Sequence, residues 1–489
     1  MDIGTLTTLN WGLLLIAVVV MIGLAIYSNK IMKTQQGESG FLLAANSLGP
    51  FVGAATIVAT GFSGWGFMGS PGVAYKYGAI ELLGNFFFSP AMIFAVLFCA
   101  RFLHQKAQSI GSLTIPEYIA RSHEGSPRVK RIVQALAAVM TIILLLVFLV
   151  GQIKALGLLG SQWLGIDKDA ASLLMVGIII LYTSVGGLAA VAFTDAFMVM
   201  GMCASAFVIV FTVFSDMSPS ELISALHTVD PELVEPSSSG PYGSSVWHVF
   251  MMLPYAFIYS TTLPYMSVRF MALSKTTKVH HVAAYMTPIA CLLSLVPIAG
   301  LYTRIKVPDL LIADEAMPVF LVNFLSPSVS AVVTLFILFA MKSTANSVLH
   351  AIAGSVSHDL RQAIWPNCQL SEKILLLLNR SSVWLLGITG FVVMMFAPPF
   401  MLSMLAILGS GTLMAALVAP ILLVHFMPST IYAALTSMLV GFGSSCVLFF
   451  RFDLGWVEAP LYASFLACSS YWLVAKVGLI YDEYVFNNA

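Results

Sequence analysis

Residues 51–78 read FVGAATIVATGFSGWGFMGSPGVAYKYG, an apolar stretch long enough to cross a membrane that is interrupted by glycines in its middle. The interruption runs from Gly61 to Gly66, and Pro71 and Gly72 follow it. Because a bilayer offers no water to unpaired backbone groups, such a backbone is tolerated only beside a polar cavity or a bound ion. Secondary transporters use discontinuous spans of this kind to hold a coupling ion and a substrate. A kinked structural helix is the alternative, since glycine and proline are common in membrane helices.

The composition of the whole chain is that of an integral membrane protein. Hydrophobic residues make up 59% and charged residues 9% of the 489 positions, and the mean hydropathy is +0.94. Soluble domains carry about 25% charged residues. We therefore expect a single all-α membrane domain over residues 1–489. About thirteen apolar runs are each long enough to cross a bilayer as a helix: 10–27, 50–77, 79–103, 131–157, 170–190, 194–215, 247–270, 280–303, 328–357, 376–397, 400–425, 429–450 and 457–479.

Lysine and arginine are unevenly divided between the two sides of the predicted bundle. They concentrate after the first, third, seventh and ninth spans, whereas the long connection at 216–246 is acidic. Cytoplasmic connections are the basic ones in membrane proteins. With thirteen spans all the basic connections fall on one side. The sequence thus predicts a cell-membrane protein with its amino terminus outside and its carboxyl terminus in the cytoplasm.

Several functional classes find no support in the sequence. It contains no phosphate-binding loop, dinucleotide fingerprint or metal-type Cys/His cluster, which argues against a primary pump and against an enzyme. The six cysteines lie in or near spans or in a cytoplasmic connection, so we expect no disulfide. We expect no cofactor, no nucleic-acid partner and no obligate protein partner. The expected partners are membrane lipids, a coupling ion and a small solute.

A second interruption occurs five spans after the first. The span at 247–270 carries Pro254 and Pro264, in a place that corresponds to the glycine run of the second span. Matching interruptions in two five-helix halves are typical of an inverted repeat with the site between the halves. We expect a core of residues 50–215 and 247–425, with 10–27, 429–450 and 457–479 as peripheral helices. We also expect the break near residues 62–66 to line a groove that faces the seventh and ninth spans.

The ninth span carries a polar face. Ala340, Ser343, Thr344 and Ser347 are spaced by three and four residues, which places them on one side of a helix. Two adjacent hydroxyls and the carbonyls of an unwound helix opposite could supply the oxygen ligands that a hard cation prefers. The alternative is that Ser and Thr bond the carbonyl one turn back, as they often do in membrane helices.

Several motifs together resemble the sodium/solute symporter family. The segment Ser63–Gly72 is similar to the proline-permease branch, and Ala74–Gly78 to the pantothenate branch. The run Tyr182–Gly187 followed by Thr194-Asp195 resembles the most recognisable motif of the family. Leu263–Tyr265 with Val268–Ala272 matches the end of the family's seventh span, and Ser343-Thr344 is in register with its hydroxyl pair. The resemblance covers nearly the whole chain and implies a fold like that of the leucine transporter.

The resemblance also implies a role for individual residues. The implied sodium ligands are the carbonyls of Ala59, Phe62 and Ala340 and the hydroxyls of Ser343 and Thr344. Asp195, at the cytoplasmic end of the fifth span, matches an acid on the ion's exit route. The implied solute-binding residues are Ser63, Gly64, Trp65, Gly66, Tyr259 and Pro264. Ala256 and Ser260 stand where proline permeases carry aromatic residues, so the solute pocket differs from theirs.

Two residues depart from the family pattern near the ion site. Gly61 replaces an acid of the proline permeases, and Lys342 stands where an apolar residue is usual. A charge inside a membrane span is costly and points to a functional role. At about 100° per residue, Lys342 lies on the opposite side of its helix from Ala340, Ser343 and Thr344. It is either a structural lysine paired with an acid on a neighbouring helix or a protonatable group that replaces sodium coupling.

The combined pattern predicts a secondary symporter that couples inward sodium movement to uptake of a small organic solute, such as an amino acid or carboxylate. Proton-coupled transport, uncoupled transport and a sensor built on a transporter fold are the alternatives. The sequence does not identify the solute.

Overall fold

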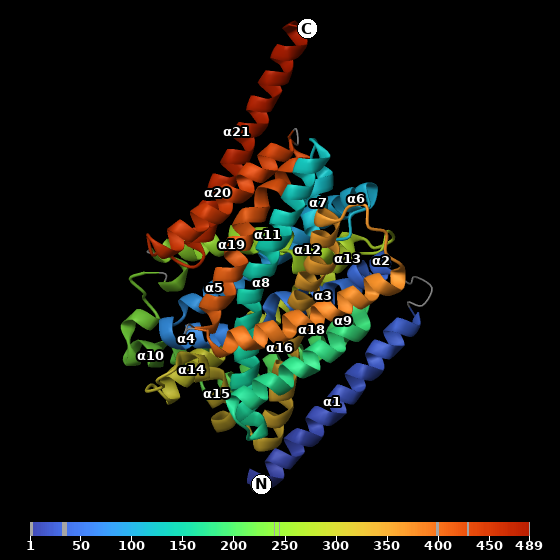
Figure 1. Cartoon of the computed structure of the whole chain (residues 1–489). Coiled ribbons are helices and arrows are strands. Elements are labelled where there is room, and N and C mark those ends of the chain that lie inside the picture. The colour runs from blue at the N-terminus through green and yellow to red at the C-terminus, as the bar shows by residue number, and fades with distance from the viewer. Residues whose placement is uncertain are drawn as a thin grey trace.

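The computed structural model describes residues 3–31, 37–238, 240–243, 245–397, 401–427 and 430–488. Within these ranges the chain forms helices and their connections and contains no β-strand, which confirms the predicted all-α class. The two termini lie at opposite ends of the helical bundle (Figure 1). This placement is what an odd number of membrane crossings requires.

Long apolar helices account for the crossings. Ten stretches among the described residues are long and apolar enough to span a membrane. Counting α9 as two limbs and adding the broken pair α11–α12 and helix α21 gives the thirteen predicted spans. The helices are α1 (Ile3–Ile31), α3 (Pro50–Gly64) with η3 (Trp65–Gly69) and α4 (Ser70–Tyr77), α5 (Ile80–Ala95) with η4 (Val96–Ala100) and α6 (Arg101–Ile110), α8 (Pro127–Leu164), α9 (Lys168–Asp216), α11 (Met252–Thr262) with α12 (Pro264–Met271), α13 (Val279–Leu293) with α14 (Ile298–Lys306), α16 (Pro327–Gly354), α18 (Glu372–Met395), α19 (Leu402–Leu422), α20 (Ile431–Phe450) and α21 (Glu458–Asn488).

Shorter helices cap the two ends of the bundle. They are α2 (Glu38–Leu43), η2 (Ala44–Asn46), α7 (Ile115–Ser122), α10 (Pro219–Val229), η5 (Pro231–Leu233), η6 (Gly240–Tyr242), η7 (Val246–Met251), η8 (Ala313–Glu315), α15 (Ala316–Phe324), η9 (Ser355–Leu360), α17 (Arg361–Ile364) and η10 (Leu423–His425).

Helix α9 folds back on itself at Gly187. A straight helix of its 49 residues would be about 74 Å long, more than twice the thickness of the hydrocarbon core. Gly187 has φ 56° and ψ −164°, outside the helical region. Both ends of α9 reach the same connection between α14 and α15, because Lys168 pairs with Glu315 and Asp216 pairs with Lys306. The two spans predicted at 170–190 and 194–215 are therefore the two limbs of a hairpin.

The two predicted interruptions are both present. Helix α3 is broken at Ser63, and α11 gives way to α12 at Leu263, which has extended backbone angles. Pro264 begins α12, a position where its missing N–H costs no hydrogen bond. Both broken spans therefore end half-way through the bundle and resume there.

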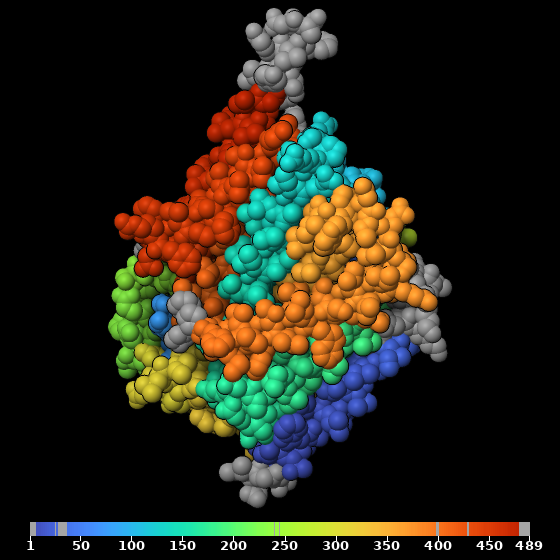
Figure 2. All heavy atoms as spheres, in the orientation of Figure 1, coloured from blue at the N-terminus to red at the C-terminus, as the bar shows by residue number. Residues whose placement is uncertain are grey.

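Burial distinguishes the core from the periphery. In the span of α3 and α4, 89% of the most apolar window is buried inside the protein, against 22% for α1 and 33% for α20. Helix α1 lies along one flank of the bundle, and α20 and α21 lie together on another (Figures 1 and 2). Helices α9, α13 and α16 pack closely against the broken helix α3.

Candidate ion and solute site

The centre of the bundle is organised by the break in α3. Ser63 has φ 42° and ψ −164°, a strained conformation for a residue with a side chain. Gln152 of α8 accepts a hydrogen bond from the N–H of Gly64 at 3.2 Å, and the hydroxyl of Ser63 accepts one from the N–H of Trp65 at 3.0 Å. These bonds replace helical partners that the break removes. The interruption predicted near residues 62–66 is confirmed.

The same break frees a backbone carbonyl for α16. In a regular helix the carbonyl of Thr60 accepts from the N–H of Gly64, but that N–H donates to α8 here. The carbonyl of Thr60 instead accepts from the hydroxyl of Thr344 at 3.0 Å. Thus α16 does face the broken helix, although Thr344 bonds to the carbonyl of Thr60 rather than to that of Ala59 or Phe62.

Asp195 joins three of these elements. Its Oδ1 accepts from the hydroxyl of Ser343 at 2.5 Å, and its Oδ2 accepts from the hydroxyl of Thr56 at 2.6 Å. The expectation that Asp195 ends the fifth span needs correction. Because the chain reverses at Gly187, Asp195 lies within the second limb of α9, where it meets α3 and α16 directly.

Arg269 of α12 is the cationic partner of Asp195 and is fully buried. Its Nη2 lies 3.5 Å from Oδ2 of Asp195, and its Nε donates to the hydroxyl of Thr56 at 2.8 Å. The guanidinium also donates to the hydroxyl of Ser347 and to the carbonyl of Tyr265. One guanidinium therefore ties α3, α9, α12 and α16 together, which a planar group with five donors can do and an ammonium cannot.

The predicted ion ligands share a buried environment with this network. All of them are fully inside the protein: Ala59, Phe62, Ala340, Ser343 and Thr344. The polar atoms around them are carbonyl, hydroxyl and carboxylate oxygens, which are the ligands that a hard cation prefers. The neighbourhood also carries positive charge, because the guanidinium of Arg269 is in contact with the carboxylate of Asp195.

Lys342 points away from the predicted ligands, as the helical spacing indicated. Its Nζ lies 3.0 Å from the sulfur of Met21 in α1 and 4.7 Å from the ring centre of Tyr182 in α9. The ring of Phe339 lies 5.9 Å away. No carboxylate among the described residues is within salt-bridge distance of Lys342. The expected acidic partner is therefore replaced by a thioether and two aromatic rings, whose faces attract a desolvated cation.

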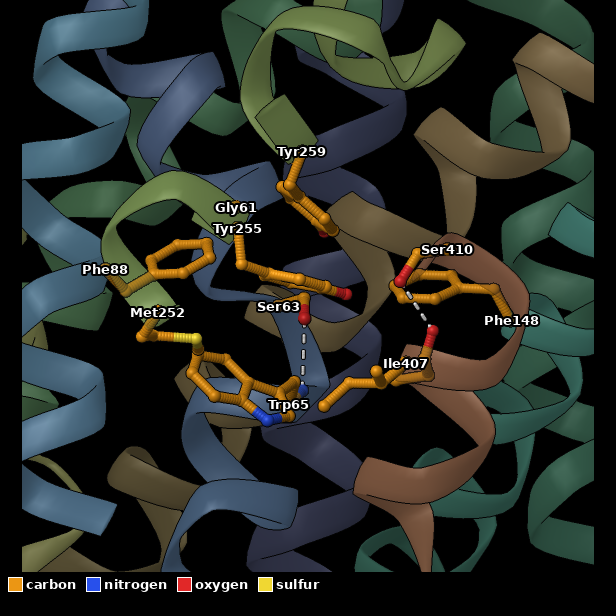
Figure 3. A pocket seen from close by; sticks show the side chains of 11 residues that line it. Gly61, Ser63, Trp65, Phe88, Phe148, Met252, Tyr255, Tyr259, Ile407 and Ser410 are labelled. Atoms are coloured by element: carbon orange, nitrogen blue, oxygen red, sulfur yellow. Dashed lines mark hydrogen bonds between the residues drawn. The ribbon is translucent and has the colours of Figure 1, made fainter. Parts of the chain in front are cut away.

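A small cavity lies beside the break and is walled by aromatic side chains (Figure 3). We call it the aromatic cavity. Its volume is about 20 Å³, room for little more than a water molecule. The walls come from α3, η3, α5, α8, α11 and α19: Gly61, Ser63, Trp65, Phe88, Phe148, Met252, Tyr255, Tyr259, Ala406, Ile407 and Ser410.

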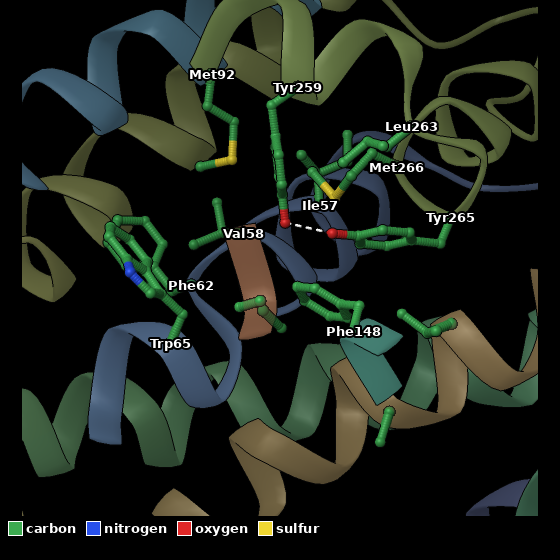
Figure 4. Close-up of a cluster of buried hydrophobic side chains, with 14 of the residues drawn as sticks. Ile57, Val58, Phe62, Trp65, Met92, Phe148, Tyr259, Leu263, Tyr265 and Met266 are labelled. Carbon is green, nitrogen blue, oxygen red and sulfur yellow. Dashed lines mark hydrogen bonds between the residues drawn. The ribbon is translucent and has the colours of Figure 1, made fainter. Parts of the chain in front are cut away.

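The rings of the aromatic cavity contact one another. Phe88 lies 5.4 Å from Trp65 and 5.8 Å from Tyr259, measured between ring centres. The hydroxyls of Tyr259 and Tyr265 are hydrogen-bonded in the apolar cluster behind the break (Figure 4). The hydroxyl of Tyr255 is buried without a hydrogen-bond partner among the described residues. The cavity thus combines aromatic walls with the buried hydroxyl of Tyr255.

Some predicted solute residues lie in this cavity and others do not. Ser63, Trp65 and Tyr259 line it, whereas Gly64 and Gly66 do not. A Cβ on Gly64 would lie 2.6 Å from Oε1 of Gln152, so this glycine serves the close approach of α8. Pro264 lines a separate small cavity towards the end of the bundle that carries α2 and α7.

Other residues of the site were not predicted. Gln152, Thr56, Tyr255 and Ser410 belong to the site, but these side chains were not singled out within their spans from the sequence. The polarity of Gln152 within an apolar run is the one feature that could have singled it out.

Comparison with known proteins places this site in context. The model of the "Sodium:solute symporter family" matches residues 41–441. The sodium/pantothenate symporter of Haemophilus influenzae is 26% identical over 465 residues, covering 90% of this chain and 91% of that protein. The high-affinity proline transporter PutP of Bacillus subtilis is 24% identical over 370 residues, covering 74% and 76%.

Solved structures share the fold. A sodium-coupled sialic acid symporter in a substrate-bound, outward-open state aligns with a TM-score of 0.76 at 15% identity, covering 96% of this chain and 98% of that one. A transporter of the nucleobase-cation-symport-1 family in a closed conformation aligns with a TM-score of 0.56 at 14% identity, covering 89% and 95%.

Proposed function

Because the chain belongs to the sodium:solute symporter family, we propose that it imports a small carboxylate-bearing solute together with sodium, and that the ion and the solute bind on the two sides of the break in α3. The observation that carries this proposal is the hydrogen bond from Thr344 to the freed carbonyl of Thr60. This bond places the hydroxyl of Thr344 against the interrupted backbone of α3. The neighbouring residue, Ser343, donates its hydroxyl to the carboxylate of Asp195.

The proposed ion ligands are the oxygens of this region. Carbonyls of Ala59, Phe62 and Ala340 and hydroxyls of Ser343 and Thr344 would surround the sodium ion. Asp195 would add negative charge from the neighbouring limb of α9. Since Ser343 now donates to Asp195, we expect its hydroxyl to turn its lone pairs towards the ion when sodium binds.

The proposed solute position is the aromatic cavity. The half-helix that begins at Trp65 presents its amino end there, and helix amino ends favour anions. Ser63, Gly64, Trp65 and Gly66 would offer backbone and hydroxyl donors to a carboxylate. That carboxylate would take over the N–H groups of Gly64 and Trp65 from Gln152 and from the hydroxyl of Ser63. Tyr259 would pack against the rest of the solute, and Pro264 would set the direction of the opposite broken span.

The relatives support a carboxylate as the solute. Pantothenate and proline, named for the two relatives above, both carry one. Among the described residues no charged side chain lines the cavity, which leaves the backbone and hydroxyl donors at the break as its recognition groups. Since the cavity holds little more than a water molecule, Trp65 and the facing tyrosines must move apart to admit a solute.

The positive-inside distribution supports an orientation in which the amino terminus is outside and the carboxyl terminus is in the cytoplasm. In that orientation α10 and the connection between α14 and α15 lie outside. The ends of α6, α7 and α17 then lie in the cytoplasm.

Uptake into proteoliposomes tests the proposal. Purified protein would be supplied with labelled pantothenate or proline, with and without an inward sodium gradient. Panthenol, the analogue of pantothenate in which an alcohol group stands in place of the carboxylate, is the matched neutral control. Sodium-driven uptake of at least one acid and not of panthenol is expected. Uptake driven by a pH gradient alone, or equilibration of the solute without accumulation, would contradict sodium coupling. Binding of the solute without transport would indicate a sensor.

A further inference from the structure

A second cavity, much larger than the aromatic cavity, opens at the end of the bundle that we assign to the outside. Its volume is about 690 Å³. It lies between the ends of α4, α8, α9, α18 and α19, under the connection from α14 to η8. We call it the vestibule. Its size suits a small organic molecule.

The walls of the vestibule carry four cationic side chains: Lys76, Lys154, Lys168 and Arg304. The positive-inside rule makes lysine and arginine sparse at an outer surface. Six of the lysine and arginine residues fall at this end of the bundle, namely Lys76, Lys154, Lys168, Arg304, Lys306 and Arg451. Four of these six therefore gather around one cavity, which the topology of the chain does not explain.

The acids of the vestibule are mostly engaged with its wall. Oδ2 of Asp314 accepts from the N–H of Leu402 at 3.0 Å, and Glu315 lies 3.7 Å from Nζ of Lys168. Asp169, in the first turn of α9, is the third acid. The cations Lys76 and Arg304 instead meet uncharged groups. Neither cation lies within salt-bridge distance of a carboxylate among the described residues, although the charge of Lys76 acts on the buried carboxylate of Asp314.

The uncharged partners of these two cations are rings and a carbonyl. Nζ of Lys76 lies 5.1 Å from the ring centre of Tyr77, and the guanidinium of Arg304 lies 5.1 Å from that of Tyr75. Nη1 of Arg304 donates to the carbonyl of Pro308 at 2.9 Å. Such partners leave the positive charge available to a ligand in the cavity.

Lys154 is the most informative of the four. It stands ten residues before the end of α8 at Leu164, a depth of about 15 Å below the helix end. A charge at such depth is costly unless it faces water or a partner. Lys154 lines the vestibule, with Leu158 one turn above it on the same face.

The floor of the vestibule separates it from the aromatic cavity. A Cβ on Gly72 would lie 2.9 Å from Oδ1 of Asp314, and one on Gly69 would lie 2.5 Å from Oγ of Ser403. The same position on Gly69 is 3.5 Å from the ring of Trp65, which lines the aromatic cavity. The two cavities therefore lie on the two sides of α4 and the start of α19.

We propose that the vestibule is a binding site for small organic anions, in which Lys76, Lys154 and Arg304 capture the carboxylate of the solute before the floor opens. The class of ligand rests on the proposed function, whereas the positive potential of the cavity can be tested without transport. With four cations against the three acids Asp169, Asp314 and Glu315, the wall has a surplus of positive charge. Such a surplus raises the local concentration of an anion and its rate of arrival.

The reactivity of a cysteine placed in the vestibule measures this potential. Leu158→Cys would be made in a chain whose six native cysteines are replaced by serine. Its rate of modification would be compared for the anionic sulfonatoethyl and the cationic trimethylammonium-ethyl methanethiosulfonates, added outside right-side-out vesicles. The anionic reagent is expected to react faster relative to its rate with free thiol. Ser224→Cys on the exposed helix α10, next to acidic residues, is the control and should prefer the cationic reagent.

Removing the charge of Lys154 tests whether this lysine causes the preference of Leu158→Cys for the anionic reagent. Adding Lys154→Gln should lower the anion-to-cation rate ratio at position 158 by roughly three- to tenfold, whereas Lys154→Arg should keep it. A ratio at or below that of free thiol in the unaltered vestibule, or one that Lys154→Gln does not change, would overturn the proposal. Protection of Leu158→Cys by pantothenate and not by panthenol would extend it to the solute. If the potential is present but no carboxylate protects or is transported, the proposed function fails and the anion site remains.

Discussion

Ser343 and Thr344 are adjacent in the chain, yet their hydroxyls reach two different elements. Ser343 donates to Asp195 of α9, and Thr344 donates to the carbonyl of Thr60 in α3. A cation held between them would therefore be coupled to both helices. We expect the double substitution Ser343→Ala and Thr344→Ala to weaken sodium activation of uptake by roughly 10- to 100-fold, the loss expected for two ligand oxygens.

Sodium dependence of initial uptake rates in proteoliposomes measures this effect. Thr344→Ser keeps the hydroxyl and should preserve sodium activation, while thermal unfolding should show that the double variant is folded. Sodium activation that is unchanged in the double variant would remove both hydroxyls from the ion site.

Lys342 is a buried charge held by a sulfur and aromatic rings rather than by an acid. Replacing a buried ionic group by an apolar one of similar volume is often neutral or stabilising by about 1–4 kcal/mol. Lys342→Met should therefore keep sodium-dependent uptake and unfold at the same temperature or a higher one. Loss of sodium dependence, or uptake that ceases to respond to pH, would instead give Lys342 a coupling role.

The residue scale shows what spacing can predict. The direction of Lys342 follows from helical geometry alone, and the structure agrees with it. Its partner depends on which helix packs behind α16, and Met21 is more than 300 positions away. The carbonyl of Thr60, which accepts from the hydroxyl of Thr344, was likewise not among the predicted contacts. Which carbonyl a break frees depends on the bond between Gly64 and Gln152, which links two distant helices.

At the scale of elements, the break in α3 depends on close packing as well as on backbone freedom. A Cβ on Gly64 would lie 2.6 Å from Gln152 and 3.0 Å from Met341. Gly64→Ala should therefore destabilise the protein by roughly 1–3 kcal/mol and abolish most uptake. Gly443→Ala in α20, where a Cβ would meet nothing within 4 Å, is the matched control and should be neutral or slightly stabilising. Equal effects in thermal unfolding and uptake would contradict the packing argument.

A second feature at the scale of elements is the contact between η8 and the start of α19. Asp314 accepts from the N–H of Leu402 at the amino end of α19 and closes the floor of the vestibule. Burial raises the pKa of Asp314 to about 6, although the bond from Leu402 and the charges of Lys154 and Lys76 act in the opposite direction. An exposed aspartate has a pKa of about 3.9.

This difference predicts that acid favours the closed floor. The closed state binds a proton more tightly than an open one, so its advantage is complete below pH of about 4 and is lost as pH rises through about 6. The ratio of open to closed protein should rise up to roughly 100-fold across that range. The modification rate of Ser410→Cys in the aromatic cavity, divided by that of Leu311→Cys at the exposed rim, measures it. Asp314→Asn should flatten the profile, and a profile that Asp314→Asn leaves unchanged would contradict this role.

The elements were more predictable than their contacts. Glycines at 61–66 and a proline at 264 lie where the spans break, because backbone without regular hydrogen bonds requires such residues at membrane depth. The two limbs of α9 were predicted as the spans 170–190 and 194–215, but the chain reverses at Gly187, inside the first of these ranges. The contacts of Gln152 and Tyr255 could not be anticipated, because a single polar or aromatic residue in an apolar helix does not show which way it faces.

At the scale of the molecule, the count of spans and the family were predictable because each depends on the whole chain. Thirteen crossings follow from hydrophobic length, and the termini at opposite ends agree with an odd number. The vestibule was not predicted, because Lys76, Lys154 and Arg304 are far apart in the sequence and meet only when α4, α8 and α14 are packed. The cations of the vestibule lie on the side that the positive-inside rule leaves poor in lysine and arginine, and the orientation was predicted from that rule. An independent measurement of the orientation therefore tests both.

The two sides of the protein can be told apart with a native cysteine. Cys368 is exposed in the connection between α17 and α18, which the proposed orientation puts in the cytoplasm. In a chain whose other five cysteines are serine, a membrane-impermeant maleimide should label Cys368 in inside-out vesicles and not in intact cells. Moving the single cysteine to Ser224 of α10 should reverse this pattern, because α10 and α17 lie at opposite ends of an odd number of crossings. Labelling of Cys368 in intact cells would invert the orientation, and the vestibule would then face the cytoplasm.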